Sequence, residues 1–233
     1  MSENPMEFVS SRKPFVYALY EGPMSAEDIE ARSFEIIERE VGTYPFSSDQ
    51  WEVVRRLVHT TADFGLMNDV KFSEDAIQSA VSALRSGHRI FVDSNMIRSG
   101  LSLARLRRVC PSYGPGDLVC HVADEDVAQE ARESGLPRSL FALRKAVGML
   151  DRGIAVFGNA PVALMELNRL IIEEGIKPAI VIAMPVGFVH VVESKQELMS
   201  LGVPHITIKG RRGGSPLAVA TVHALCSLAA GQM

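Results

Sequence analysis

The sequence predicts a parallel α/β sheet of about five strands with helices on both faces, preceded by a helical N-terminal portion. Two observations lead to this fold class. Short β-branched apolar runs end in Gly, Pro or Asp, which is typical of strands buried on both faces. These runs alternate with helical patterns, and such alternation indicates parallel strands joined by right-handed crossovers. The predicted strands are residues 89–92, 117–122, 154–157, 180–182 and 205–208.

Three helices are predicted before the first of these strands. The first begins after Ser25, with Asp28 in the capping-box position, and the next two follow the polar caps around Ser47 and Ser73. We treat residues 1–23 as an N-terminal extension, in which 15–19 could form a short strand, and 24–233 as a single α/β domain. The remaining predicted helices are 126–134, 137–151, 162–174, 188–201 and 216–230.

Composition limits the class of protein. The 233 residues are 47% hydrophobic and 22% charged, as in a globular protein. The formal net charge of -4 gives no basic field that would attract nucleic acid. The N-terminus lacks the pattern of a signal peptide, and the longest apolar window, 176–192, is interrupted by charged and Pro residues, so we expect no membrane partner. Three widely spaced cysteines fit reduced thiols, so we expect a soluble cytoplasmic protein.

The clearest physical signal for a ligand is the segment 209–216, Lys-Gly-Arg-Arg-Gly-Gly-Ser-Pro, between the last strand and the last helix. Gly213 and Gly214 free the backbone, Ser215 is a candidate cap, and the start of a helix favours an anion. Lys209 and the two arginines add cationic donors. The alternative is a basic surface turn. The spacing matches neither a Walker P-loop nor a dinucleotide fingerprint.

Two further loops follow predicted strands. Gly158-Asn-Ala-Pro161 precedes a helix, and we expect Asn159 to cap that helix and the backbone at 158–159 to offer unpaired N–H groups to a ligand. The alternative is simply a well-capped helix. Met184-Pro-Val-Gly-Phe188 follows the next strand. Because ligands of open α/β sheets bind at the carboxyl ends of the strands, the three loops predict one site.

His59 is the candidate acid–base residue. It lies on the second helix, one turn after Arg55, and Thr60, Thr61 and Asp63 follow it as a cluster able to orient an imidazole. A packed or surface histidine is the alternative. The other histidines show no metal-ligand spacing, so we expect no protein-bound metal. No nucleophile elbow is present either, so hydrolase chemistry is unsupported.

Five motifs occur in order along the chain. They are Ile29-Glu-Ala-Arg-Ser-Phe-Glu-Ile-Ile37, Val58-His-Thr-Thr-Ala-Asp-Phe64, Gly158-Asn-Ala-Pro161, Met184-Pro-Val-Gly-Phe-Val189 with Glu193-Ser-Lys195, and Gly210-Arg-Arg-Gly-Gly-Ser215. Together they resemble the precorrin-8X methylmutase family, which includes its cobalt-precorrin-8 form, over about residues 25–230.

The resemblance implies a flavodoxin-like fold, a homodimer and no cofactor. It also implies the migration of a methyl group from C-11 to C-12 of a tetrapyrrole substrate, precorrin-8X or cobalt-precorrin-8, in cobalamin biosynthesis. The product would be hydrogenobyrinate or cobyrinate.

The resemblance assigns the general acid to His59, which would protonate a ring nitrogen beside the migration site. Three departures from the family pattern are Val162 for Thr, His190 for Gly and His223 for Asn, and His190 is a rival proton donor. The residues expected to hold the carboxylate-rimmed macrocycle are Arg32, Ser33, Arg138, Ser139, Asn159, Gly187, Phe188, Arg211, Gly213, Gly214 and Ser215.

Two other functions compete with an isomerase. One is a non-catalytic protein that binds or hands over a corrinoid intermediate, and the other is a nucleotide- or phosphate-binding α/β protein that uses the 209–216 loop. The visible spectrum of a corrinoid substrate distinguishes the three, because only methyl migration changes its conjugation.

Overall fold

The computed structural model describes residues 13–231, which form two units, one ending at Thr43 and the other beginning at Tyr44. Residues 13–43 of the first unit contain α2 (Tyr17–Glu21) and α3 (Ala26–Val41). Ser25 and Asp28 form the predicted capping box at the start of α3. The short strand predicted at 15–19 is wrong: backbone N–H groups there donate to carbonyls three residues earlier and form a helical turn. Residues 1–12 of the predicted extension lie outside the described residues.

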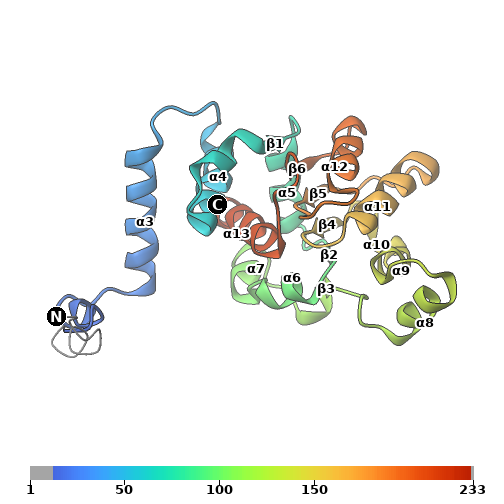
Figure 1. Ribbon diagram of the computed structural model, residues 1–233, viewed down its shortest axis with the longest axis horizontal. Coiled ribbons are helices and arrows are strands. Elements are labelled where there is room, and N and C mark those ends of the chain that lie inside the picture. Colours follow the sequence, from blue (N-terminus) through green and yellow to red (C-terminus); the bar gives the residue numbers. More distant parts are fainter. Residues whose placement is uncertain (1–12, 232–233) are drawn as a thin grey trace, which may run out of the picture. The chain divides into compact units, whose positions relative to one another are not determined.

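The second unit contains the sheet (Figure 1). Its strands are β1 (Val70–Phe72), β2 (Ile90–Val92), β3 (Leu118–Val119), β4 (Ile154–Phe157), β5 (Ile180–Ala183) and β6 (His205–Ile208). Its helices are α4 (Ser48–Thr61), η1 (Phe64–Asp69), α5 (Ala76–Arg85), α6 (Asn95–Gly100), α7 (Leu103–Val109), η2 (Pro115–Asp117), α8 (Glu125–Ser134), α9 (Arg138–Lys145), α10 (Val147–Leu150), α11 (Pro161–Glu174), α12 (Val191–Ser200) and α13 (Ser215–Gly231).

The strand order is β1-β6-β5-β4-β2-β3. All neighbours are parallel except β1, which runs antiparallel to β6 with Val70 opposite Ile208. The five predicted strands are therefore confirmed, and counted along the chain they follow the order 2-1-3-4-5 of the flavodoxin-like class. Strand β1 was not predicted, because this three-residue run containing Lys71 is defined by its pairing with β6 and not by any local periodicity.

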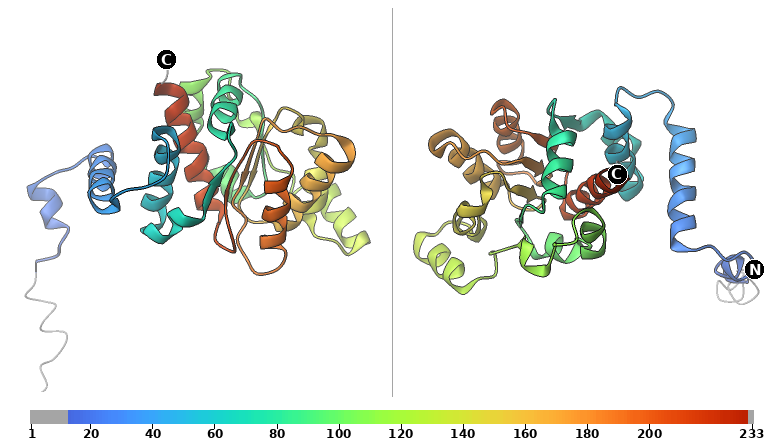
Figure 2. Two further views of the ribbon diagram at one scale, coloured as in Figure 1. Left: turned by 90° about the horizontal axis from the view of Figure 1, so that it is seen from above. Right: turned by 180° about the vertical axis from the view of Figure 1, so that it is seen from behind.

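Helices cover both faces of the sheet (Figure 2). On one face α13 packs against β4 and β5, with α4, α5 and α7 around it. On the other face α11 packs against β4 and α12 against β6, and α9 packs against α11. The core on this second face is built from Phe91, Phe157 and Val181 of the strands and Leu164 and Leu167 of α11.

Two helix predictions needed correction. The helix predicted over 137–151 divides into α9 and α10 at Ala146, whose N–H donates to carbonyls two and three residues earlier. The third helix begins at Ala76, because the N–H of Ser73 instead donates to the carbonyl of His205 and the Ser73 hydroxyl accepts from the N–H of His205. Within the described residues, every helix is too short or too polar to cross a bilayer.

Candidate functional site

The loops that leave the carboxyl ends of the parallel strands form one edge of the sheet. The chain runs from β2 to one side, toward β3, and from β4 to the other side, toward β5. This reversal between β2 and β4 is the topological switch point, where doubly wound sheets bind their ligands. Asp93 and Ser94 follow β2, and Gly158 and Asn159 follow β4, so the predicted edge is confirmed as a meeting point of loops.

At the switch point a protein carboxylate occupies the place expected for a ligand. Asp93 is 2% exposed, and its Oδ2 accepts hydrogen bonds from the backbone N–H groups of Asn159 at 2.8 Å and Ala160 at 2.6 Å. The N–H of Gly158 donates to both Asp93 oxygens at 3.1 Å. The expectation of unpaired N–H groups at 158–159 is therefore wrong. Burial raises the pKa of Asp93, and the three N–H donors act in the opposite direction.

The predicted cap at Asn159 is also wrong. The N-cap of α11 is Ala160, whose side chain cannot cap, and Pro161 occupies the first helical turn as predicted. Asp93 supplies the missing acceptor from 66 residues away in the sequence, which no local pattern could show. The exposed Asn159 side chain is left at the edge of the sheet.

The loops after β5 and β6 are locked together through their backbones. The N–H of Gly214 donates to the carbonyl of Met184 at 2.7 Å, and the N–H of Gly187 to the carbonyl of Arg211 at 3.3 Å. A Cβ at Gly213 would lie 2.2 Å from the Met184 oxygen, so only glycine permits this approach. The two predicted loops thus form one rigid structure.

Ser215 is the first residue of α13 and not its cap. Its hydroxyl lies 3.1 Å from that of Ser94, and a Cβ at Gly158 would lie 2.8 Å from its Cα. The start of α13 therefore lies directly against the switch point. Ser94 was not among the predicted site residues, although its position directly after a buried strand is typical of a ligand-binding edge.

The segment that follows His59 reaches the basic loop through an ion pair. His59 is partly buried in the last turn of α4. Asp63, four residues later, accepts from the N–H of Gly65 at 2.8 Å and pairs with Nη1 of Arg212 at 3.1 Å. The structure thus brings the end of the His59 helix to the 209–216 loop.

The hydroxyls of Thr60 and Thr61 have local partners. Thr60 donates to the carbonyl of Arg56 at 2.7 Å, and Thr61 donates to that of Leu57 at 3.0 Å. Both bonds lie within α4, so these hydroxyls serve the end of the helix. Ala62 then takes a left-handed conformation, with φ of 52°, and ends the helix.

Arg211 and Phe188 form the outer part of the interlocked loops. Phe188 is 83% exposed, and the guanidinium carbon of Arg211 lies 5.3 Å from the centre of its ring. Val186 and Val189 beside it are also exposed. A protruding apolar surface next to a cation suits a flat ligand with an acidic rim.

The remaining predicted residues belong to other elements of the chain. Arg138 is exposed and begins α9, followed by the partly buried Ser139. Arg32 and Ser33 belong to α3 of the first unit, where the Ser33 hydroxyl donates to the carbonyl of Ile29 at 2.9 Å. Within the second unit, hydrogen bonds and an ion pair join the loops that carry the predicted residues between 159 and 215 to the end of the His59 helix.

Two of the three departures have a structural role. His190 has a φ of 59° at the start of α12, which explains why glycine would suit this position. His223 accepts a hydrogen bond at Nε2 from the N–H of Ser102 at 3.0 Å and so links α13 to the cap of α7. Val162 is partly buried in the first turn of α11, and the structure gives no reason for it.

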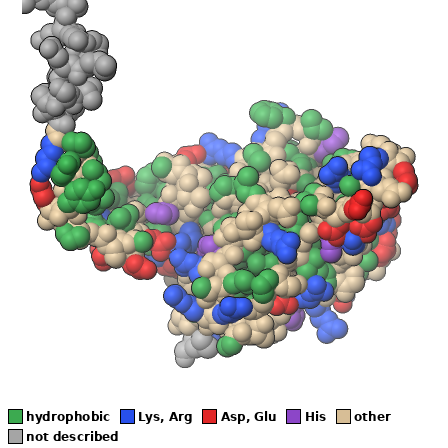
Figure 3. All heavy atoms as spheres, turned by 90° about the horizontal axis from the view of Figure 1, so that it is seen from below, with side chains coloured by type: hydrophobic (Ala, Val, Ile, Leu, Met, Phe, Trp, Pro, Cys, Tyr) green, Lys and Arg blue, Asp and Glu red, His purple; other side chains and the backbone are tan. Residues whose placement is uncertain are grey.

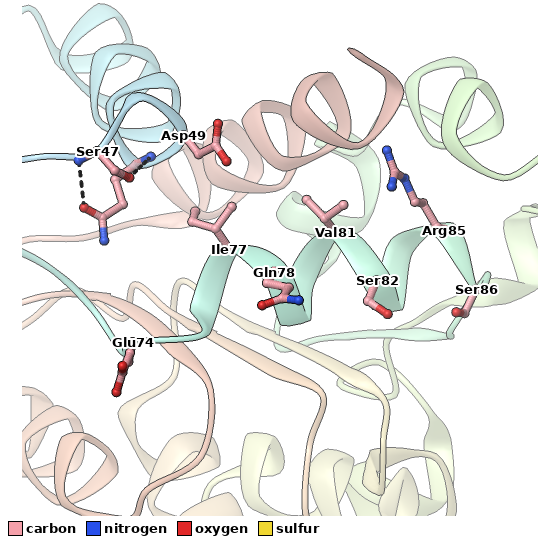
Figure 4. Close-up of a pocket in the computed structure, with 10 residues that line it drawn as sticks. Ser47, Asp49, Glu74, Ile77, Gln78, Val81, Ser82, Arg85 and Ser86 are labelled. Atoms are coloured by element: carbon pink, nitrogen blue, oxygen red, sulfur yellow. Dashed lines mark hydrogen bonds between the residues drawn. The ribbon is translucent and has the colours of Figure 1, made fainter. Parts of the chain in front are cut away.

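Three open hollows of the second unit are lined by residues other than those of these loops. One of about 640 Å³ lies between the start of α4 and α5, where Ile77, Val81 and Arg85 point from α5 (Figure 4). Others, of about 710 and 450 Å³, are lined by residues around β1 and around Pro178. Because doubly wound sheets bind their ligands at the carboxyl ends of the strands, the converging loops remain the candidate site.

Charge on the surface is mixed. In Figure 3, Lys and Arg side chains are spread among hydrophobic ones on the face shown. Within residues 13–231, no group of three or more His, Cys, Asp or Glu is placed to hold a metal ion.

The strand order and the interlocked loops at the carboxyl edge define a flavodoxin-like α/β protein. Its family follows from comparison: the model of the precorrin-8X methylmutase family matches residues 28–228, and the chain belongs to this family. The family consists of methylmutases, which are isomerases, of cobalamin biosynthesis. The resemblance drawn from the five motifs is thereby confirmed.

Individual relatives agree. The chain is 40% identical to the cobalt-precorrin-8 methylmutase of Priestia megaterium over 224 residues, 96% of this chain and 94% of that one. It is 33% identical to the precorrin-8X methylmutase of Pseudomonas aeruginosa over 198 residues, 84% and 92% of the two chains. A crystal structure of precorrin-8X methylmutase from Thermus thermophilus has a TM-score of 0.80 and 41% identity, covering 89% of this chain and 98% of that one.

Proposed function

We propose that this protein moves the methyl group at C-11 of precorrin-8X, or of its cobalt form, to C-12, with His59 as the general acid. The observation that supports this most is the Asp63–Arg212 ion pair, which brings the helix of His59 to the loops that would hold the substrate. The substrate and the product have the same atoms. The imidazole donates a proton to a ring nitrogen of the macrocycle, and that nitrogen returns the proton to the imidazole after the methyl group has moved. A positioned proton donor contributes about 10²–10⁴-fold.

The substrate suits the edge of the sheet. Precorrin-8X is a large apolar macrocycle whose rim carries acetate and propionate carboxylates. We propose that Phe188 contacts the ring while Arg211 pairs with a carboxylate, and that Asn159 lines the same surface. We propose that the backbone of the two loops also contacts the substrate, at Gly187, Gly213, Gly214 and Ser215. Arg32, Ser33, Arg138 and Ser139 are proposed as further contacts on the rim.

The test compares two histidine variants in a spectroscopic assay. His59→Ala should convert precorrin-8X about 10²–10⁴-fold more slowly while it still binds the macrocycle, because it lacks only the proton donor. His190→Gly is the matched control, since this exposed histidine lies beside the same loops and is the rival donor. Full turnover in His59→Ala would remove His59 from the acid role, and loss of turnover in His190→Gly alone would transfer the role to His190.

The carrier alternative predicts a different result for the wild-type protein. A carrier shifts the absorption bands of the bound corrinoid without forming hydrogenobyrinate or cobyrinate. Band shifts without product would therefore favour it over the isomerase.

We further propose a homodimer, on the resemblance of the chain to its family. Sedimentation at several concentrations tests it, and a monomer at all of them would contradict it.

A further inference from the structure

Lys195 is a buried lysine that the proposed function leaves unexplained. It lies in α12 with a side chain that is 1% exposed. Its Nζ donates hydrogen bonds to the carbonyls of Ile208 at 2.8 Å, Gly210 at 3.1 Å and Arg212 at 2.7 Å. An ammonium group has three N–H donors, so these contacts use all of them.

Such a group is costly to bury. A lysine is rarely found fully buried, because its charge loses hydration. Burial lowers the pKa of Lys195 to about 8, although the nearby carboxylate of Asp69 acts in the opposite direction. An apolar side chain of similar size would leave the three carbonyls without this donor, so the hydrogen bonds are what distinguishes lysine at this position.

The three acceptors lie along one stretch of backbone. Ile208 ends β6, and Gly210 and Arg212 flank Arg211 in the loop that follows. Gly210 has a φ of 78°, so the chain turns sharply there. Lys195 therefore holds the backbone on both sides of Arg211 from within the protein.

Other contacts hold the same loop at its sides. Arg212 pairs with Asp63, and Gly214 bonds to Met184. Arg211 is exposed, and its guanidinium is the one that lies over Phe188. The contacts of Lys195 thus fix the direction in which Arg211 leaves the loop.

We propose that Lys195 is a positioning residue for substrate binding: by holding the carbonyls of Gly210 and Arg212, it presents the guanidinium of Arg211 to a carboxylate on the rim of the macrocycle. The proposal rests on the proposed function for the identity of the ligand. The hydrogen bonds that carry it concern only the loop. Its two parts can therefore be tested separately.

The first part is tested on the loop alone. Lys195→Met removes the donors and keeps much of the volume, and Lys177→Met, at an exposed lysine, is the matched control. Trypsin cleavage after Arg211 and Arg212 is followed by mass spectrometry, with cleavage after the exposed Arg152 as the internal reference. Lys195→Met should be cleaved in the loop about 10-fold faster or more than the wild type, because local opening no longer breaks three hydrogen bonds.

The second part is tested with the macrocycle. Lys195→Met should raise the KM for precorrin-8X about 10-fold and change kcat by less than about 3-fold, because Arg211 acts in binding and the proton donor is intact. An unchanged KM, or a loss confined to kcat, would overturn the proposal even if the loop loosens. Unchanged cleavage in the loop would overturn it as well.

Two outcomes need a second measurement: an unfolded Lys195→Met variant, and a wild-type protein that does not bind precorrin-8X. If Lys195→Met does not fold, Lys195→Arg keeps the charge and donors but not the fit, and it should loosen the loop in the same direction. If wild-type protein neither binds nor converts precorrin-8X, the proposed function fails. The cleavage experiment then still decides whether Lys195 holds the loop.

Discussion

Replacing Asp93 tests how the switch point is built. Asp93→Ala removes the acceptor of the N–H groups of Gly158, Asn159 and Ala160, which lie within 3.1 Å of its oxygens. Each buried donor left without a partner costs about 1–3 kcal/mol. Two effects reduce the loss. Asn159 is exposed and its bond to Asp93 is only partly buried, so water can replace the lost acceptor of its N–H. The variant also no longer has to bury a carboxylate. We therefore expect a loss of about 3–4 kcal/mol in the free energy of unfolding.

Asp93→Asn should lose less, about 1–2 kcal/mol, because its amide keeps one acceptor oxygen but no charge. Asp151→Ala is the control for an exposed acceptor. Like Asp93, Asp151 accepts from the backbone, but from a single N–H, that of Lys177 at 3.1 Å, and its side chain is exposed. We expect it to lose less than about 1 kcal/mol. Urea unfolding followed by circular dichroism gives all three values. Equal losses in Asp93→Ala and Asp151→Ala would refute the reasoning.

Three further predictions concern the surrounding loops. His190→Gly should raise the free energy of unfolding by about 0.5–1 kcal/mol, because it relieves a left-handed residue, and a lower melting temperature would contradict this. Since burial lowers the pKa of Lys195 from 10.5 to about 8, its charge costs stability below pH 8 and this cost disappears as pH rises to 10.5. Relative to Lys195→Met, the free energy of unfolding of the wild type should therefore increase by up to about 3 kcal/mol between pH 8 and pH 10.5. Parallel plots of unfolding free energy against pH for the two proteins would exclude a lowered pKa of Lys195. In a double-mutant cycle, Asp63→Asn and Arg212→Gln should couple by less than about 1 kcal/mol in stability, because both side chains are about half exposed, and a coupling above about 2 kcal/mol would contradict this.

Local patterns in the sequence determined much of the fold. The capping boxes at Ser25 and Ser47 and the five parallel strands follow from residues that are close together in the chain, so they could be predicted without the structure. The five motifs led to the family, and the basic loop with its glycines was found from composition and spacing alone.

Only the tertiary structure decided how the site is held together. Asp93 caps α11 from 66 residues away, Lys195 bonds to the loop after the next strand, and Arg212 joins the loop to the segment after the helix of His59. The short strand β1 likewise exists only through its pairing with β6. In each case a side chain or backbone group finds its partner across the fold, and such distances are set by packing, which leaves no periodicity in the sequence.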